Sequence, residues 1–214
     1  MSTRLEIISD PICPWCYLGA ANLMRALATR EAHPFELIWQ PYQLNPDVPA
    51  EGVDRAAYLA EKLGDPEKVE ASHARLTEMG AEAGITYRFD RMTRIPNTLD
   101  AHRLIRWAGA EGVQTRAAMA IFQRNFEAGE DISDAGVLTS VAAEVGMDAA
   151  VTARLLAGDA DRAEVQAEAE AAREMGVTGV PTFIIGGRYA VSGAQPPDLW
   201  ERLMSELDAA GAQG

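Results

Sequence analysis

Cys13-Pro14-Trp15-Cys16 decides how the rest of the sequence is interpreted, because it holds both cysteines of a 214-residue chain. It follows an apolar run, Leu5 to Ser9, typical of a short buried strand, and precedes an apolar pattern typical of a helix. A thiol at a helix N-terminus faces unpaired backbone N–H groups and the positive end of the helix dipole, which favour the thiolate. The stretch therefore predicts a redox pair, with Cys13 as nucleophile and Cys16 as resolving thiol.

The composition is that of an acidic globular protein. Hydrophobic residues make up 48% of the chain, and 32 acidic residues against 19 basic ones give a formal charge of −13. That charge argues against nucleic acid or an anionic membrane as the main partner. There is no apolar run of about 18 residues, and Met1-Ser2-Thr3-Arg4 leads into a strand pattern. We therefore expect no signal segment, no membrane span and a cytoplasmic location.

The sequence around the cysteines predicts a strand-helix-strand unit. Asp10-Pro11 ends the first strand, and Pro14 is tolerated in the first turn of a helix. Cys16 falls on the apolar, inward face of that helix. Alternating apolar residues from Phe35 to Trp39 predict a second strand, and the intervening helix is long enough for the crossover that parallel strands require.

After the second strand the pattern becomes almost wholly helical. Predicted helices cover 56–63, 68–83, 99–110, 117–127, 135–145 and 149–156. A short extended piece is expected at 85–89, and a helix over 161–175 is expected to return the chain to the sheet. We interpret 51–159 as an inserted helical domain, and 1–50 together with 160–214 as the domain that holds the sheet.

The end of the sequence predicts further strands. Thr182 to Ile185 and Tyr189 to Ser192, joined through Gly186-Gly187, predict an antiparallel hairpin. Pro196-Pro197 opens a last helix, and the tail after Ala209 is expected to fray.

The loop before this hairpin carries the second informative motif. Val180-Pro181 leads directly into the strand, and proline at a strand entry makes a cis bond accessible. Together with the two cysteines and the order of elements, this loop resembles the thioredoxin superfamily, in which the proline is cis and lies beside the active-site pair. The resemblance implies that Pro181 takes that place and that the backbone of Val180 pairs with a bound substrate chain. It also implies an α/β, thioredoxin-like fold with a helical domain inserted between the second and third strands.

Within that superfamily the long insertion resembles the DsbA-like branch. The stretch Ser9 to Gly19, SDPICPWCYLG, is similar to FrnE-like DsbA proteins, whose relatives include 2-hydroxychromene-2-carboxylate isomerase and kappa-class glutathione transferase. The segment Asn97 to Arg103, NTLDAHR, also resembles a motif of that group.

This resemblance implies substrate contacts at Pro14 and Trp15, between the cysteines, and at Asn97 and His102. The last two also have a structural explanation, because Asn97 after a proline fits the N-cap of a helix with Asp100 in its third position.

One position departs from the resemblance. Thioredoxin and DsbA carry a buried acid six residues before the first cysteine that moves protons to and from the pair, and this chain has Ile7 there. Alternation along the strand places Glu6 on the opposite face. Asp10 is a candidate proton acceptor, and an interaction with free N–H groups beside the helix explains Asp10 equally well.

These observations favour a thiol-disulfide oxidoreductase acting on protein or small-molecule thiols and disulfides. We expect no tightly bound cofactor, leave glutathione open as a co-substrate, and expect no metal, because a zinc site would need His33, His73 or His102 to converge from distant segments. A glutathione-dependent isomerase or transferase is the first alternative. The retained pair argues against it, since the isomerase relatives have Ser at the position of Cys13. A redox-switched chaperone-like binding module is the second, and the chain is expected to be a monomer or homodimer.

Overall fold

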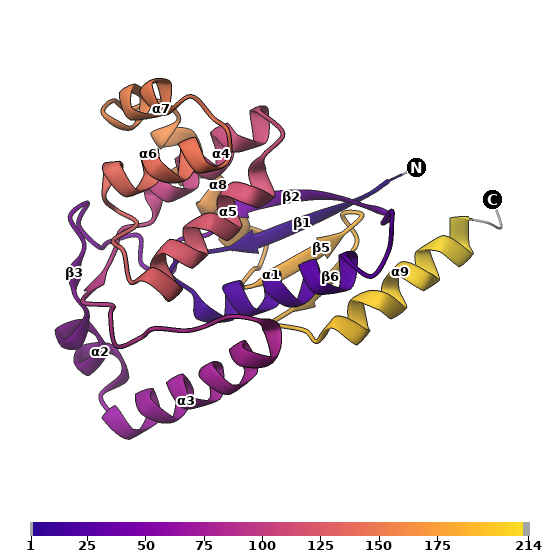
Figure 1. Ribbon diagram of the computed structural model, residues 1–214, viewed down its shortest axis with the longest axis horizontal. Helices are drawn as coiled ribbons and strands as arrows, with labels where there is room; N and C mark the ends of the chain where they lie inside the picture. The colour runs from indigo at the N-terminus through magenta and orange to yellow at the C-terminus, as the bar shows by residue number, and fades with distance from the viewer. Residues whose placement is uncertain (1, 212–214) are drawn as a thin grey trace.

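The computed structural model describes residues 2–211 and is centred on a four-stranded sheet in the order β2-β1-β5-β6 (Figure 1). The strands are β1 (Thr3–Ser9), β2 (Phe35–Pro41), β5 (Thr182–Ile185) and β6 (Tyr189–Ser192). β1 pairs in parallel with β2, through the crossover helix α1 (Pro14–Leu27), and antiparallel with β5, which forms a hairpin with β6. The predicted strands, crossover and hairpin are confirmed.

The other elements follow the predicted order with small shifts at their ends. They are β3 (Val53–Asp54), α2 (Arg55–Leu63), α3 (Pro66–Ala83), β4 (Arg94–Ile95), α4 (Leu99–Ala110), α5 (Gln114–Gln123), the π-helical turn η1 (Arg124–Ala128), α6 (Ala135–Glu144), α7 (Ala149–Leu156), α8 (Arg162–Glu174) and α9 (Pro197–Gly211). Of the tail that was expected to fray, 212–214 lie outside the described residues.

The extended piece predicted at 85–89 is wrong as a strand. The small second sheet is instead the pair β3 and β4. The aromatic residues of 85–89 pack inwards, with the rings of Tyr87 and Phe89 stacked at 5.0 Å, and the Arg88 N–H donates to the carbonyl of Phe126 at 2.7 Å. Aromatic side chains favour strands and buried packing alike, and here tertiary packing decides between them.

Alternation along the strands divides the sheet into two buried faces. Leu5, Ile7 and Phe183 contribute to the core shared with α1, whereas Ile8 packs in a second cluster that includes Ala172 of α8. On the first face α9 adds Trp200, whose ring lies edge-on to Phe183 at 4.7 Å. Each large apolar side chain buried in this way contributes about 1.5–3 kcal/mol. The carboxyl end of β1 is thus fixed on both sides.

The helices between β2 and α8 enclose that end of the sheet. α3 packs against α1, while α4 and α5 pack against β2. Figure 1 shows α2 and β3 at the end of the molecule where β1 leads into α1, with α9 at the opposite end. The observed order places the helical segment between β2 and β5, as the sequence predicts.

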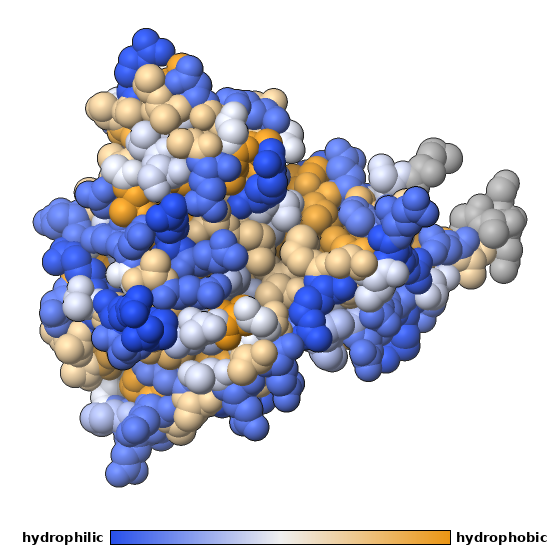
Figure 2. All heavy atoms as spheres, viewed as in Figure 1, coloured by the Kyte–Doolittle hydropathy of each residue, from blue (hydrophilic) through white to orange (hydrophobic). Residues whose placement is uncertain are grey.

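Most of the face shown in Figure 2 is hydrophilic, and its hydrophobic residues form small separate patches. Across residues 2–211, every helix is either too short or too polar to span a bilayer.

Candidate active site

Cys13 lies at the junction between β1 and α1. Its N–H donates to the carbonyl of Asp10 at 2.9 Å, which closes a tight turn after the strand, and its own carbonyl accepts the Cys16 N–H at 3.0 Å. Cys13 is the N-cap residue of α1 but makes no side-chain capping hydrogen bond. Pro14, the first residue of the helix, has no N–H to be capped. The Cys13 sulfur therefore lies at the positive end of the helix dipole and caps none of the helix N–H groups.

The two thiols differ in access. Both are free, and the exposed fraction is 5% for Cys13 and 1% for Cys16. Cys13 lines a cavity of about 400 Å³, and Cys16 is not among the residues that line it. Burial raises the pKa of the Cys16 thiol, and its hydrogen bond with Cys13 raises it further. The prediction that α1 carries Cys16 on its inward face is confirmed.

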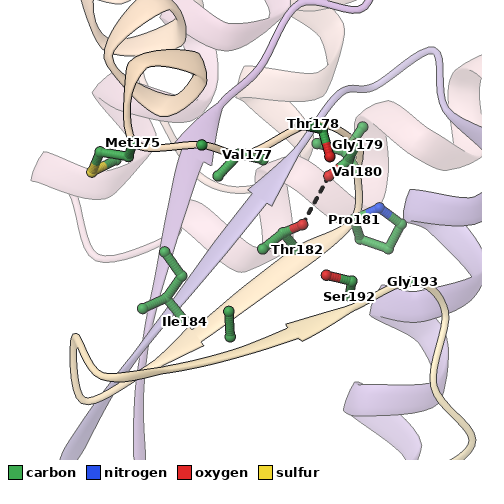
Figure 3. Close-up of a pocket in the computed structure, with 12 residues that line it drawn as sticks. Met175, Val177, Thr178, Gly179, Val180, Pro181, Thr182, Ile184, Ser192 and Gly193 are labelled. Carbon is green, nitrogen blue, oxygen red and sulfur yellow. Dashed lines mark hydrogen bonds between the residues drawn. The ribbon is translucent and has the colours of Figure 1, made fainter.

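The proline loop reaches Cys13 from the far end of the chain. The Val180–Pro181 peptide bond is cis, as predicted, and the Cys13 thiol donates to the Val180 carbonyl at 3.7 Å. Thr182 Oγ1 donates to the Gly179 carbonyl at 2.8 Å, which holds the turn of the loop (Figure 3). The proline loop thus lies directly beside the first cysteine.

The same loop also lines a second pocket. It has a volume of about 380 Å³ and is lined by the loop itself, by Ile184 of β5 and by Ser192 near the hairpin end (Figure 3). Neither cysteine lines it. Of these two cavities, the one lined by Cys13 is therefore the one in which a bound molecule could reach a thiol.

The cavity beside Cys13 is mainly apolar and carries one arginine. Its walls include Ile12, Leu59 and Phe126, and Arg55 and His73 add polar groups. Arg55 Nη2 lies 3.1 Å from His73 Nε2. A guanidinium only donates, so this imidazole nitrogen accepts and the ring is neutral. Burial and the Arg55 charge lower the pKa of His73, which agrees with that state.

Arg55 has no acidic partner in the described part of the chain. Its guanidinium is half-buried, lies 6.0 Å from the centre of the Phe89 ring, and forms no ion pair with a carboxylate. A partly desolvated cation without a counterion gives an anion a favourable place to bind. The cavity thus combines a reactive sulfur, an apolar wall and a cationic group.

Aromatic packing ties the cavity to the start of α1. Tyr87 OH donates to the Pro14 carbonyl at 2.6 Å. The Tyr87 ring stacks on Phe89, and Phe89 stacks on His73 at 4.1 Å. The turn η1 adds Asn125, which donates to the Pro11 carbonyl at 3.0 Å. These contacts hold the backbone on both sides of Cys13.

Sequence reasoning missed Arg55 and Tyr87 as site residues, and it weighed His73 only as a metal ligand. The aromatic cluster at 85–89 was a signal, but it was interpreted as an extended piece. In the part of the chain that the structure covers, no set of three His, Cys, Asp or Glu side chains is arranged to hold a metal ion.

Two of the other predicted site residues line the cavity beside Cys13, and two do not. Trp15 and Pro14 line the cavity, and the Arg75 guanidinium lies 5.7 Å from the centre of the Trp15 ring. Asn97 and His102 do not line it. Their proposed contacts with substrate therefore find no support in the cavity's shape.

Asn97 has a structural role close to the one predicted. Its Oδ1 accepts the Leu99 N–H at 2.9 Å, and its Nδ2 donates to the Val48 carbonyl at 2.6 Å. The N-cap of α4 is Thr98 rather than Asn97, which corrects the predicted cap by one residue. Asn97 thus joins the start of α4 to the loop after β2.

Asp10 and His102 are both buried, and their side chains lie close together. Asp10 is fully buried, and its carboxylate accepts N–H groups from Leu44 at 2.6 Å and Ile12 at 3.4 Å. His102 Nε2 lies 3.7 Å from Asp10 Oδ1 and 3.1 Å from the Tyr42 carbonyl. Asp10 thus accepts backbone N–H groups, as one of the two explanations held, but they are those of Ile12 and Leu44 rather than those of α1 itself.

Comparison with known proteins agrees with this geometry. Residues 4–205 match the DSBA-like thioredoxin domain. A probable DsbA oxidoreductase from Streptomyces coelicolor is 32% identical, with a TM-score of 0.83 over 95% of this chain and 89% of the other.

Two further structures share the fold. A 2-hydroxychromene-2-carboxylate isomerase has a TM-score of 0.74 at 16% identity, covering 98% of both chains. The cytosolic disulfide reductase DsbM from Pseudomonas aeruginosa, solved with GSH, has a TM-score of 0.70 at 20% identity, covering 95% of this chain and 98% of the other.

The fold and the paired thiols define a thiol-disulfide oxidoreductase with a thioredoxin-like fold and a helical insertion. The chain belongs to the DSBA-like thioredoxin domain family.

Proposed function

We propose that Cys13 and Cys16 exchange electrons with substrate disulfides while the Val180–Pro181 loop aligns the substrate. The observation that carries this proposal is the asymmetry of the pair: Cys13 opens into a cavity and touches the Val180 carbonyl, whereas Cys16 is enclosed. Pro14 and Trp15 line the same cavity and are proposed to contact the substrate. A role in substrate binding for Asn97 and His102 would need the cavity to extend beyond its present walls.

The reaction has two exchange steps. The Cys13 thiolate attacks one sulfur of the substrate disulfide, the substrate S–S bond breaks, and the leaving thiolate takes the electron pair. Cys16 then loses its proton and attacks Cys13 Sγ, which releases the second substrate thiol. The products are a Cys13–Cys16 disulfide and a reduced substrate, so two electrons pass from the protein to the substrate.

Glutathione is the co-substrate that we propose for returning the pair to its reduced form. One glutathione thiolate attacks the Cys13–Cys16 disulfide, and a second resolves the mixed disulfide and leaves as glutathione disulfide. Two observations support this choice. Arg55 offers an unpaired cation to a carboxylate of glutathione, and the structurally similar DsbM was solved with GSH and is described as cytosolic. A cytoplasmic setting is part of the same proposal.

The test is reduction of a disulfide substrate by wild type, Cys13→Ser and Cys16→Ser, with glutathione as reductant. Cys13→Ser is expected to abolish turnover, whereas Cys16→Ser should accumulate a mixed disulfide at Cys13 that mass spectrometry detects. Turnover by Cys13→Ser at the wild-type rate would disprove the assignment. A glutathione-dependent isomerase would instead convert a chromene carboxylate and would not need Cys16, so Cys16→Ala separates the two functions.

A further inference from the structure

Cys16 is the group whose chemistry the cavity does not explain. It must lose a proton before it can attack Cys13, yet its side chain has almost no contact with water. Burial, Cys13 and the Asp10 carboxylate all raise the pKa of this thiol, while the Asp10 backbone N–H lowers it. Ile7 of β1, which belongs to the same buried cluster as Cys16, supplies no acidic group. A base inside the protein is therefore needed close to Cys16.

Asp10 belongs to the turn that carries the cysteines: its carbonyl accepts the Cys13 N–H at 2.9 Å, and the Cys13 carbonyl accepts the Cys16 N–H at 3.0 Å. It lies at the carboxyl end of β1, fully buried, and the Leu44 and Ile12 N–H groups hold its two oxygens. A buried carboxylate is costly unless donors surround it, and these two backbone groups occupy only part of its accepting capacity. The Asp10 carboxylate therefore still has lone pairs that can accept a proton.

His102 completes the surroundings of that carboxylate. It lies in the first turn of α4 with an exposed fraction of 4%. Its Nε2 faces the Tyr42 carbonyl and Asp10 Oδ1, and both of these groups accept. Nε2 therefore carries a hydrogen in either protonation state of the ring. The imidazole holds an N–H dipole beside Asp10, with Tyr42 fixing the orientation of the ring.

The neighbouring charged groups do not compete for Asp10. Its titratable neighbours along the chain are Cys13, in the same turn, and Cys16, in the first turn of α1, and the loop after β2 contributes the Leu44 N–H and the Tyr42 carbonyl. Arg173 of α8 stacks over the Tyr42 ring at 4.7 Å, and Arg103 of α4 donates to the carbonyls of Leu155, Gly158 and Ala160. Both cations are thus engaged elsewhere.

We propose that Asp10 and His102 form one buried pair that takes the proton of Cys16 when Cys16 attacks the mixed disulfide at Cys13. This inference rests on the proposed function and adds its proton-transfer step. The Cys16 proton moves to the Asp10 carboxylate, the Cys16–Cys13 bond forms, and the bond from Cys13 to the substrate sulfur breaks with its electron pair on the leaving thiolate. His102 is a positioning residue that keeps the carboxylate oriented.

The experiment mixes reduced protein with one equivalent of Ellman's reagent in a stopped-flow instrument. The first thionitrobenzoate is released when Cys13 attacks the reagent, and the second when Cys16 resolves the adduct, so the two steps are read separately. Asp10→Asn is expected to slow the second phase on the order of a hundredfold and to leave the first phase unchanged. Its second-phase rate should rise by about tenfold per pH unit, because only preformed thiolate reacts. The wild-type profile should be flatter.

The sign of the change distinguishes two roles for Asp10. If its charge only suppresses the Cys16 thiolate, Asp10→Asn makes the thiolate easier to form and the second phase speeds up. A second phase as fast as wild type, or faster, overturns the proposal. Loss of the two-phase release in wild type would instead overturn the proposed function itself.

His102 variants and a matched control complete the test. His102→Phe removes the donor and should slow the second phase, whereas His102→Gln can still donate to Tyr42 and should restore most of the rate. The double variant Asp10→Asn/His102→Phe should be no slower than Asp10→Asn, because the two residues act as one unit. Glu6→Gln removes an acid that pairs with Arg4 on the same strand and should change neither phase. A slow phase that is equal in His102→Gln and His102→Phe contradicts the positioning role.

Discussion

A β-carbon on Gly19 would lie 3.1 Å from Cγ of Pro181, so the cis-proline loop packs directly on the backbone of α1. Figure 3 shows the Pro181 ring directed toward that helix. The contact sets how far the Val180 carbonyl stands from Cys13, and a larger residue at 19 must push the loop away.

Gly19→Val is therefore expected to lower stability by about 1–3 kcal/mol and to slow disulfide exchange by Cys13. Urea unfolding and the first phase of the Ellman reaction measure the two effects. Gly109→Val is the matched control, because Gly109 is an exposed residue of α4 whose neighbour is the Gln114 side chain, bound to Trp39 of β2, rather than the proline loop. Exchange at the wild-type rate in Gly19→Val would show that the loop position does not matter.

The unequal access of the two thiols predicts unequal alkylation. In native reduced protein, iodoacetamide should modify Cys13, which lines the cavity, well before Cys16, which is enclosed and has a raised pKa. Peptide mass spectrometry after timed quenching distinguishes the sites. In urea the two should react alike. Equal rates in the native protein would contradict the burial of Cys16.

Stability should fall at alkaline pH. Burial raises the pKa of Cys16, Tyr17 and Tyr87 in the folded protein. A group with a raised folded pKa contributes stability that is complete below its unfolded pKa and is lost as the pH rises toward the folded value. The unfolded values are about 8.5 for cysteine and about 10 for tyrosine. The free energy of unfolding of the reduced protein is therefore expected to decline above about pH 8.5 and more steeply above about pH 10.

Urea titrations across that pH range check this prediction. Cys16→Ser should remove the first part of the decline, and Tyr87→Phe should reduce the second part. Tyr87→Phe should also cost about 1 kcal/mol at neutral pH, through loss of the hydrogen bond to the Pro14 carbonyl. A stability that stays constant up to strongly alkaline pH would show that these groups ionise equally in both states.

Arg55, which has no acidic partner among the described residues, predicts a preference for anionic disulfides. Arg55→Met should raise the KM for glutathione disulfide on the order of tenfold, the effect of losing one charge-assisted hydrogen bond. The KM for the neutral hydroxyethyl disulfide should stay the same. Lys62→Met, which removes an exposed cation from the same helix, is the control for net charge. An equal rise for both substrates would point to a general disturbance of the cavity.

The parts of the fold that were predictable are those specified by local patterns. Each of these patterns depends on neighbouring residues, and each prediction was confirmed: the apolar run of β1, the alternation in β2, the helical spacing around Cys16 and the double glycine before β6. The cis bond at Val180–Pro181 was predictable for a different reason, the resemblance of this loop and the cysteine pair to the thioredoxin superfamily, because most X–Pro bonds are trans.

The composition of the cavity was not predictable from such patterns. Arg55 begins α2 and His73 lies in α3, while Tyr87 lies in the loop after α3, and only tertiary packing brings the three to Cys13. His102 shows the same limit. Its motif pointed to substrate, but the packing of α4 against β2 places it beside Asp10.

The pairing of β1 also bears on how the protein is made. Its parallel partner β2 is synthesised early, whereas its antiparallel partner β5 lies near the other end of the chain, with Leu5 opposite Ile185. Contacts between residues so distant in sequence form late and slow folding. During synthesis on the ribosome, the edge of β1 that pairs with β5 stays unpaired until Thr182 to Ile185 have been made. The thiols are then most open to unwanted oxidation before translation ends.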